Sequence, residues 1–564
     1  MTDPIYPDPG TGSDSTILCI WTTGFAIAPP YLYNMMFLAP LLIFLSGLYS
    51  QVTATWPNYV VDELEHLLVD TDRFNDAGFQ KAITPCQNYV NGSQLLGRET
   101  AAQGVRVAFH DFVTANVQAG TGGIDASIGF ETLRPENSGA AMNDSLAFFA
   151  PFVNAEVSMA DMIALSIVMV VGTCSSPSIA VPLRGGRVDA TEAGPFGVPE
   201  PETDIDTTLN QFSLAGFNQE DAIGLTVCGH TLGSVHHAGF PQVVPESAVT
   251  LNNTGGGVHF DATPAVFDVD VLREYLEGNG QRGGPLVTTD NITVRSDLRL
   301  YLSDNNATLR GLAESDSKFI STCVSLLERM IDTIPSSVHL TDDIVPQELK
   351  PINISLAVDA DGHVQFNGYI RLLSTAFNPT DKVQISWRSR GGASSPAFET
   401  SASAASMGNS SMFGTTFYHF FNTTIDPTNG ISTFDVSVLG PSSSAQTFSN
   451  GGVGYPIEDL AIFLSHETTI AADGTLSVHA AVLTSADVLN VTAVVSAPSP
   501  QIGTLSPTIA KSEVILEAVG TRGLYTLYGA QVPAVTNVQQ TTAELIAYGP
   551  EGDVYRDTFR RISH

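Results

Sequence analysis

The chain has 564 residues, enough for about two to four domains of typical size. Its 24 Lys and Arg against 58 Asp and Glu give a formal net charge of −34, which excludes the basic surfaces that bind nucleic acid or anionic lipid. Only 15% of the residues are charged and 43% are apolar. This composition predicts a globular protein with a large core rather than a charge-rich disordered chain.

An apolar run at residues 37–49 has the length of a signal-peptide core, and small residues suited to cleavage follow it. The run is shorter than a membrane span. Residues 1–54 are therefore predicted to be the leader of a secreted protein, and no stable membrane span is expected. No basic residue precedes the run. A start at Met35 or Met36 would place a free amino group beside it, and residues 1–34 would then be an upstream extension. An uncleaved membrane anchor is the alternative interpretation.

Nine Asn-X-Ser/Thr sequons are spread along the chain, and each is a candidate glycosylation site of a secreted protein. They begin at Asn91, Asn143, Asn252, Asn291, Asn306, Asn353, Asn409, Asn422 and Asn490.

Residues 55–346 have the apolar periodicity of helices. An apolar stretch runs from Ala160 to Val171, and Asn218 is followed by two acidic residues, which is typical of a capped helix start. Helical periodicity also covers Val269–Leu276 and Lys318–Ile334. This part of the chain is predicted to be one mainly α domain.

From residue 347 onward, short alternating apolar runs and Gly-containing turns replace the helical pattern. The segment ADGHVQFNGYIRL at 360–372 is similar to ADGTLSVHAAVL at 472–483, which indicates one hairpin used twice. We therefore predict two β-sandwich-like modules, at 347–455 and 456–564. Neither module shows a pattern that predicts chemistry.

The segment Arg106-Val-Ala-Phe-His-Asp111 carries the first candidate for chemistry. Arg106 and His110 are four residues apart and would share one face of a helix. The guanidinium charge would hold the imidazole neutral, so His110 could act as a base while Arg106 stabilises developing negative charge. An isolated Arg/His pair of this kind is more often a surface contact.

Four later segments change that interpretation. Gly123-Ile-Asp-Ala-Ser127 and Phe260-Asp-Ala-Thr-Pro-Ala-Val-Phe-Asp268 are rich in the oxygen ligands that calcium prefers. Gly229-His-Thr-Leu-Gly233 ends a predicted helix and suits an axial imidazole ligand. Arg295-Ser-Asp297 supplies a carboxylate that could accept a hydrogen bond from the far nitrogen of that imidazole.

Taken together, these segments resemble the secreted haem peroxidases of the plant, fungal and bacterial superfamily, and most closely the fungal enzymes. The motifs R-x-x-F-H-D, G-x-D-x-S, G-H-T-L-G, D-x-T-P-x-x-F-D and S-D occur in the family's order over about residues 56–340. The resemblance implies a mainly α haem peroxidase domain followed by the β modules, with haem b and two Ca²⁺ as cofactors. It also implies a secreted enzyme that uses H₂O₂ to oxidise small phenolic or aromatic donors by one-electron steps.

The resemblance also assigns a role to each matching residue. His110 looks like the distal acid/base, Arg106 like the distal cation that polarises the O–O bond, and Phe109 like the residue packed over the haem. Asn137 matches an asparagine hydrogen-bonded to the distal imidazole, and Glu131 matches a carboxylate linked to that network. His230 looks like the axial iron ligand and Asp297 like its carboxylate acceptor. His236 matches a propionate-side position, and Pro199 matches a proline near the exposed haem edge.

Two calcium sites are implied in the same way. The distal ligands would be Asp111, Gly123 through its carbonyl, Asp125 and Ser127. The proximal ligands would be Thr231, Asp261, Thr263, Val266 through its carbonyl, and Asp268. Ordinary turn hydrogen bonding by Asp, Ser and Thr is the alternative explanation for both loops.

Departures from the family pattern narrow the activity. Manganese-oxidising relatives carry an acidic residue at the position of His236, so the sequence disfavours Mn²⁺ oxidation. Cys86 and Cys174 match one family disulfide. Cys228 and Cys323 either pair with each other or remain two buried thiols.

A second hypothesis comes from a different class of protein. The chain could be a cell-wall or surface adhesive protein, in which the β modules bind glycan or protein and the peroxidase-like domain is vestigial. The matched distal and proximal residues favour the enzyme, with cell-wall contact through the β modules as an additional expectation.

Overall fold

The computed structural model describes residues 56–86, 88–89, 98–440, 444–533, 535, 539–552 and 554–562. All described residues belong to one compact unit. The predicted leader at 1–54 and the sequon at Asn91 lie outside the described residues.

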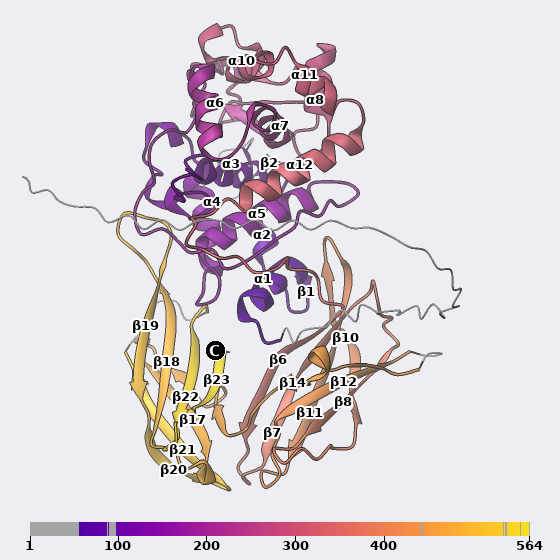
Figure 1. The fold of residues 1–564 in the computed structure, drawn as a ribbon, viewed down its shortest axis with the longest axis vertical. Helices are drawn as coiled ribbons and strands as arrows, with labels where there is room; N and C mark the ends of the chain where they lie inside the picture. The colour runs from indigo at the N-terminus through magenta and orange to yellow at the C-terminus, as the bar shows by residue number, and fades with distance from the viewer. Residues whose placement is uncertain are drawn as a thin grey trace, which may run out of the picture. The chain divides into compact units, whose positions relative to one another are not determined.

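The first half of the described chain is helical, and the predicted fold class is confirmed (Figure 1). The helices are α1 Tyr59–Val69, α2 Phe79–Ile83, α3 Thr100–Phe112, α4 Ala141–Phe149, α5 Met159–Thr173, α6 Ile205–Leu214, α7 Gln219–Gly229, α8 Asp270–Glu277, α9 Pro285–Thr288, α10 Ser296–Leu302, α11 Ala307–Leu312 and α12 Asp316–Ile331. Short strands accompany them: β1 Asp72–Arg73, β2 Asn88–Tyr89, β3 Arg98–Glu99, β4 Ser234–His236 and β5 Gly257–His259.

Local sequence explains where the main helices begin. The Ser158 side chain caps α5 by accepting the Asp161 N–H at 3.0 Å. At the start of α7, Asn218 and Asp221 each accept the other's backbone N–H, at 2.9 and 3.0 Å, in a capping box. Apolar residues surround the whole circumference of α5, which is buried from Met159 to Gly172. This helix therefore forms the centre of the helical core.

Two disulfides tie the helical part together. Cys86 pairs with Cys174 at the end of α5, and Cys228 of α7 pairs with Cys323 of α12. The second pair decides the alternative that the sequence left open, because the two thiols are bonded to each other.

The second half consists of antiparallel strands. They are β6 Leu349–Val358, β7 Val364–Leu373, β8 Lys382–Arg388, β9 Phe398–Glu399, β10 Ser401–Ser410, β11 Gly414–Ile425, β12 Thr433–Leu439, β13 Gln446–Phe448, β14 Tyr455–Pro456, β15 Ala461–Phe463, β16 Thr469–Ile470, β17 Leu476–Leu483, β18 Asn490–Ser499, β19 Thr508–Ile515, β20 Glu517–Arg522, β21 Tyr525–Val532, β22 Thr542–Tyr548 and β23 Val554–Arg561.

These strands form two pairs of sheets. One pair has the orders β1-β10-β11-β7-β6 and β13-β12-β8-β9, and the other has β15-β17-β21-β20 and β19-β18-β22-β23. Phe366 of β7 and Ile385 of β8 come from the two sheets of the first pair and share one core. Val478 of β17 and Val491 of β18 do the same in the second pair. Face-to-face sheets with a common core are the arrangement of a β-sandwich.

The repeated hairpin of the sequence occupies equivalent places in the two sandwiches. Gly362 turns the chain between β6 and β7 with φ +87°, and Gly474 turns it between β16 and β17 with φ +84°. Both positions need the left-handed backbone that glycine adopts without strain. The strands that follow, β7 and β17, alternate buried and half-buried side chains at their starts.

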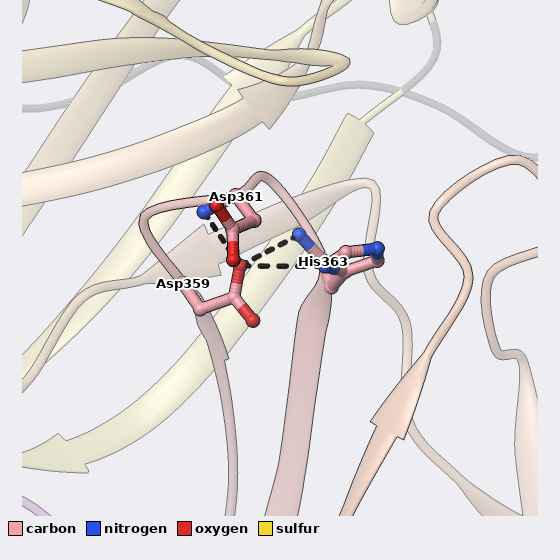
Figure 2. Close-up of side chains that lie close together, drawn as sticks. All are labelled: Asp359, Asp361 and His363. Atoms are coloured by element: carbon pink, nitrogen blue, oxygen red, sulfur yellow. Dashed lines mark hydrogen bonds and ion pairs between the residues drawn. The ribbon is translucent and has the colours of Figure 1, made fainter.

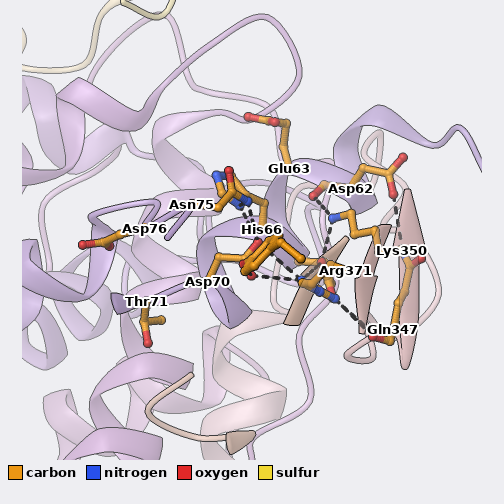
Figure 3. Close-up of polar contacts among 12 residues, drawn as sticks. Asp62, Glu63, His66, Asp70, Thr71, Asn75, Asp76, Gln347, Lys350 and Arg371 are labelled. Atoms are coloured by element: carbon orange, nitrogen blue, oxygen red, sulfur yellow. Dashed lines mark hydrogen bonds and ion pairs between the residues drawn. The ribbon is translucent and has the colours of Figure 1, made fainter. Parts of the chain in front are cut away.

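A buried polar network joins α1 to the first sandwich (Figure 3). Arg371 of β7 is completely buried and donates to the carboxylates of Glu65 and Asp70. The Lys350 Nζ donates to Glu65 at 2.6 Å, and the Tyr418 hydroxyl donates to Asp70 at 2.6 Å. Strand β1, which follows α1, pairs with β10 in the same sheet. The first sandwich therefore supplies the cations that pair with the buried carboxylates at α1.

None of the helices formed by the described residues is long and apolar enough to span a membrane.

Candidate active site

Helix α3 presents the predicted distal residues to a cavity. Arg106 and His110 are one helical turn apart, and the Arg106 Nε donates to the His110 Nε2 at 3.2 Å. The other ring nitrogen of His110, Nδ1, lies 2.7 Å from the Asn137 Oδ1. The Asn137 Nδ2 donates to the carbonyl oxygen of Glu131 at 3.0 Å, which orients the amide oxygen toward the imidazole. His110 therefore carries its proton on Nδ1 and presents a lone pair on Nε2.

The environment of His110 keeps the ring neutral. Burial lowers its pKa first, and the positive charge of Arg106 lowers it further, to about 3. The hydrogen bond to Asn137 acts in the opposite direction without offsetting these effects. A buried neutral imidazole with an unprotonated Nε2 is suited to accept a proton from a small ligand.

Glu131 has a different role from the one the sequence predicts. Its backbone carbonyl, rather than its carboxylate, accepts the hydrogen bond from Asn137. The carboxylate accepts the Gly194 N–H at 2.7 Å and pairs with Arg134 at 3.1 Å. Glu131 therefore fixes the loop that holds Asn137, and its negative charge is neutralised by Arg134.

The C-terminal end of α7 places His230 beside the same cavity. Its Nδ1 lies 2.7 Å from the Asp297 Oδ2, and Ser296 donates to the other oxygen of Asp297 at 3.1 Å. Phe260 stacks on the imidazole with ring centroids 4.1 Å apart and an interplanar angle of 6°. With Nδ1 engaged and the ring plane fixed, Nε2 is the nitrogen left to bind a metal.

The cavity has a volume of about 260 Å³ and is lined by both sets of residues. Arg106, Phe109 and His110 contribute from α3, and His230 contributes from the end of α7. Most of the remaining lining is apolar and includes Leu225, Leu232, Val235, Phe240, Phe260, Leu286, Leu300, Leu327 and Met330. The residues fit an iron porphyrin, because the chamber is apolar and His230, held by a carboxylate, would supply an imidazole nitrogen to the iron.

Asp111, in the last turn of α3, is contacted by the loop that carries the other predicted distal calcium ligands. Asp111 accepts the backbone N–H groups of Asp125 and Ala126 at 3.1 and 2.9 Å, and the Ser127 hydroxyl lies 3.5 Å from its other oxygen. Burial and then the negative charge of Asp125 raise the pKa of Asp111. Gly123 has φ +102°, and a side chain there would strike the Thr333 carbonyl at 2.2 Å. Two crowded, buried carboxylates fit a bound divalent cation.

Four of the predicted proximal ligands, Asp261, Thr263, Val266 and Asp268, lie in one hydrogen-bonded loop. The Asp261 Oδ1 accepts the Thr263 N–H at 2.8 Å, whereas the Asp261 Oδ2 is buried without a hydrogen-bond partner among the described residues. Thr263 donates to Asp268 at 3.3 Å, and the Val266 N–H donates to the Thr263 carbonyl at 2.8 Å. Thr231, directly after His230, is buried. Burial raises the pKa of Asp261 to about 7, with Asp268 adding to the effect. An orphaned carboxylate oxygen beside these side chains fits a calcium ligand set.

His236 and Pro199 also line the cavity, where the sequence places them. Sequence reasoning missed the ring of Phe260 on His230 and the ring of Phe240, which lies 5.3 Å from the Arg106 guanidinium. No periodicity or motif marks either contact, because each joins segments that are distant in the chain.

The sequons of the described part lie mostly on exposed positions. The side chains of Asn143, Asn252, Asn291, Asn353, Asn422 and Asn490 are exposed, and those of Asn306 and Asn409 are half-buried. Exposure makes these positions accessible to modification without testing whether it occurs.

A separate group of metal-ligand types lies in the β6–β7 turn (Figure 2). Asp359, Asp361 and His363 place candidate ligand atoms within 4.8 Å of one another. One oxygen of Asp359 accepts the N–H groups of Asp361 and His363 at 3.0 and 2.9 Å, which is the hydrogen bonding of a turn. The other two side chains are exposed. The arrangement is explained by the turn.

Comparison with known proteins finds similarity to peroxidases in the helical half of the chain. Residues 86–321 match the family model described as Peroxidase. A WSC domain-containing protein of Arthroderma benhamiae is 40% identical over 349 residues, covering 60% of this chain and 46% of that protein. Peroxidase 36 of Arabidopsis thaliana is 27% identical over 299 residues, covering 50% of this chain and 80% of that protein. L-ascorbate peroxidase 5, peroxisomal, of the same plant is 33% identical over 163 residues, covering 28% and 57%. The chain spans about half the length of the first and third of these relatives.

Proposed function

Since residues 86–321 form a domain of the plant, fungal and bacterial haem peroxidase superfamily, we propose that the protein uses H₂O₂ to oxidise small phenolic or aromatic donors. One observation carries this proposal. A neutral, oriented His110 beside Arg106 and a carboxylate-held His230 line one apolar cavity. A base, a cation and an axial imidazole around one chamber are the groups that peroxide reduction at a haem requires.

The residues divide the work between them. Haem b, held through His230, would supply an iron centre able to exchange electrons with peroxide and with donors. His110 accepts a proton from one peroxide oxygen at Nε2 and returns it to the other oxygen. Arg106, 3.2 Å from that nitrogen, stabilises the negative charge that develops as the O–O bond breaks. Asp297 holds the Nδ1 proton of His230 and raises the basicity of the ligand.

His110→Ala in the haem-loaded protein tests this assignment. We expect the second-order rate of reaction with H₂O₂, followed by stopped-flow absorbance, to fall by about 10²–10⁴-fold because the proton acceptor is lost. His479→Ala is the matched control, since His479 lies on β17 in the second sandwich. An unchanged rate in His110→Ala would show that His110 is not the base.

Two further parts of the proposal concern cofactors and donors. The loops at Asp111–Ser127 and Asp261–Asp268 each hold one Ca²⁺ and thereby fix α3 and the end of α7. A histidine at position 236 is a weaker partner than a carboxylate for a hard cation such as Mn²⁺. Phenols rather than Mn²⁺ are therefore the proposed donors, and a side-by-side steady-state assay with both decides the point.

The proposed location is extracellular. Disulfides persist in oxidising compartments, and the Cys86–Cys174 and Cys228–Cys323 bonds support secretion. Expression of the full chain in a eukaryotic host, with assay of the medium and the cell fraction, tests the location. Removal of N-glycans by an endoglycosidase tests whether the sequons are used.

A second candidate function, adhesion through the β modules, is favoured by one exposed feature. Phe420 of β11 is 47% exposed and packs against Tyr369 of β7 with centroids 5.2 Å apart. Exposed aromatic rings on a sheet are a common surface for binding glycans or proteins. Sedimentation of the full chain with isolated cell wall tests this idea. Binding that Phe420→Ser weakens supports it, and no binding by the parent protein removes it.

A further inference from the structure

The cavity opens to solvent beside a group of carboxylates. Of the residues that line it, Gly139 and Glu200 are exposed, so they mark its mouth. Pro201, the residue after Glu200, lines the cavity as well, and exposed Glu202 follows it. Burial and the negative charges of Glu202 and Glu136 raise the pKa of Glu200. Three carboxylates therefore act on one another where a donor must enter.

Glu136 contributes an unsatisfied acceptor to this mouth. Its side chain is only 8% exposed, and it lines the cavity. The Glu136 Oε2 accepts the Gly197 N–H at 3.1 Å, whereas the Oε1 is buried without a hydrogen bond. The nearest cation to Oε1 is the Arg134 guanidinium at 3.7 Å. A buried carboxylate oxygen without a donor is costly, so it is a ready acceptor for a ligand N–H group.

An exposed aromatic ring lies next to these carboxylates. Phe196 is 68% exposed, and its ring stacks on the Arg134 guanidinium at 4.1 Å. Arg134 is held in turn by the carbonyl oxygens of Gly194 and Pro195 at 2.7 and 3.0 Å. The ring is thus fixed in place although it is open to solvent, which suits it to stack on an aromatic ligand.

The positive charges near the mouth do not cancel the carboxylates. The charge of Arg134 is met by the buried carboxylate of Glu131 at 3.1 Å. Arg299 donates to the carbonyl oxygens of Pro201 and Thr203, at 2.5 and 2.9 Å. Arg106, the one Lys or Arg side chain among the described residues that line the cavity, donates to His110. Glu136, Glu200 and Glu202 therefore make the mouth negative.

We propose that this mouth selects aromatic donors that carry a positive charge, namely phenols with an alkylammonium side chain. The donor ring stacks beside Phe196, and its ammonium group lies among Glu136, Glu200 and Glu202. Anionic phenols are repelled by the same groups. The inference rests on the proposed peroxidase function, because it names the substrate class that the same cavity prefers.

Three phenols of similar size and different charge provide the test. Tyramine is cationic, 4-ethylphenol is neutral and 3-(4-hydroxyphenyl)propionate is anionic. With the haem-loaded full chain at low ionic strength, we expect kcat/KM for tyramine to exceed that for the propionate by about tenfold or more. The ratio should shrink in about 0.5 M salt, because the screening length of charge interactions then falls to about 4 Å.

Variants locate the effect. Glu200→Gln should lower the tyramine-to-propionate ratio about threefold, as expected for loss of one exposed charge near the donor. Glu513→Gln, an exposed position on β19 in the second sandwich, changes the net charge equally and should leave the ratio unaltered. Because Glu200 is exposed, its replacement should not disturb folding.

Binding without peroxide separates this inference from the proposed function. Dissociation constants from saturation-transfer NMR should favour tyramine over the propionate in the parent and less so in Glu200→Gln. Turnover of 4-ethylphenol with a ratio near one would overturn the charge selection and leave the peroxidase proposal intact. If no phenol is oxidised, the peroxidase proposal fails and the NMR result alone decides. Equal binding of the two ions would then overturn the inference.

Discussion

Replacement of Arg371 by Met should destabilise the protein strongly, because Arg371 is the central cation of the network around α1. Its side chain is 0% exposed and donates to Glu65, Asp70 and the Gln347 carbonyl. Methionine retains an apolar stem of similar length and removes the charge.

The magnitude follows from what remains after the change. Glu65 keeps Lys350 at 2.6 Å, and Asp70 keeps the Tyr418 hydroxyl and His66 at 2.6 and 2.8 Å. Two buried carboxylates are then left with a single Lys cation. Breaking a buried ion pair on one side costs about 3–5 kcal/mol. That is a large share of the roughly 5–15 kcal/mol that stabilises a typical domain.

Urea unfolding of the two proteins at 25 °C, followed by circular dichroism and by fluorescence, measures the loss. Arg556→Met is the control, because Arg556 is 50% exposed and its pair with Glu544 at 2.6 Å is open to water. Such a pair contributes about 0–1 kcal/mol. If Arg371→Met loses no more free energy of unfolding than Arg556→Met, the network does not hold α1 to the first sandwich.

Further predictions concern the cavity and its calcium loops. The rate of reaction with H₂O₂ should stay constant as the pH falls until about pH 3, because the pKa of His110 is about 3 and the neutral ring is the base. In Arg106→Leu the loss of rate on acidification should begin at a higher pH, because the positive charge that lowers this pKa is gone. Stopped-flow rates that fall at the same pH in both proteins would contradict the role of Arg106. The pKa of Asp261 is about 7 against an ordinary value of 3.8, so between about pH 4 and pH 7 the metal-free folded protein holds a proton that the unfolded chain has released. Its free energy of unfolding should therefore fall as the pH rises through that window, and Ca²⁺ should remove the trend; urea titrations with and without a chelator measure both, and identical curves would argue against a cation there. Asp297→Asn removes the negative charge 2.7 Å from the His230 Nδ1 and should raise the haem reduction potential measured by spectroelectrochemistry; an unchanged potential would refute the charge transfer to the ligand.

Residues that act through local spacing could be predicted from the sequence. The four-residue separation of Arg106 and His110 places both on one face of α3, and the capping pair at Asn218 sets the start of α7. The hairpins at Gly362 and Gly474 follow from the turn that glycine permits. Local geometry alone produces these features, so a motif or a period reports them.

Contacts between distant segments could not be predicted in this way. Arg371 and Glu65 are 306 positions apart, and a lone Arg in an alternating strand resembles a solvent-facing residue until α1 covers it. Glu136 directly precedes Asn137, to which the resemblance assigns a role, but no sequence pattern marks the Glu136 oxygen as buried and unsatisfied. The pairing of Cys228 with Cys323 required the packing of α7 against α12.

The pairing of β1 with β10 imposes an order on biosynthesis. Asp72 must pair with Asn409, and a ribosome that adds about 5–20 residues per second reaches the second strand roughly 20–70 s after the first. For most of that interval the nascent helical part carries Glu65 and Asp70 without Arg371. The amino-terminal edge of the helical part therefore stays incomplete until about residue 410 has been synthesised, and a chaperone that shields this edge would act on the nascent chain.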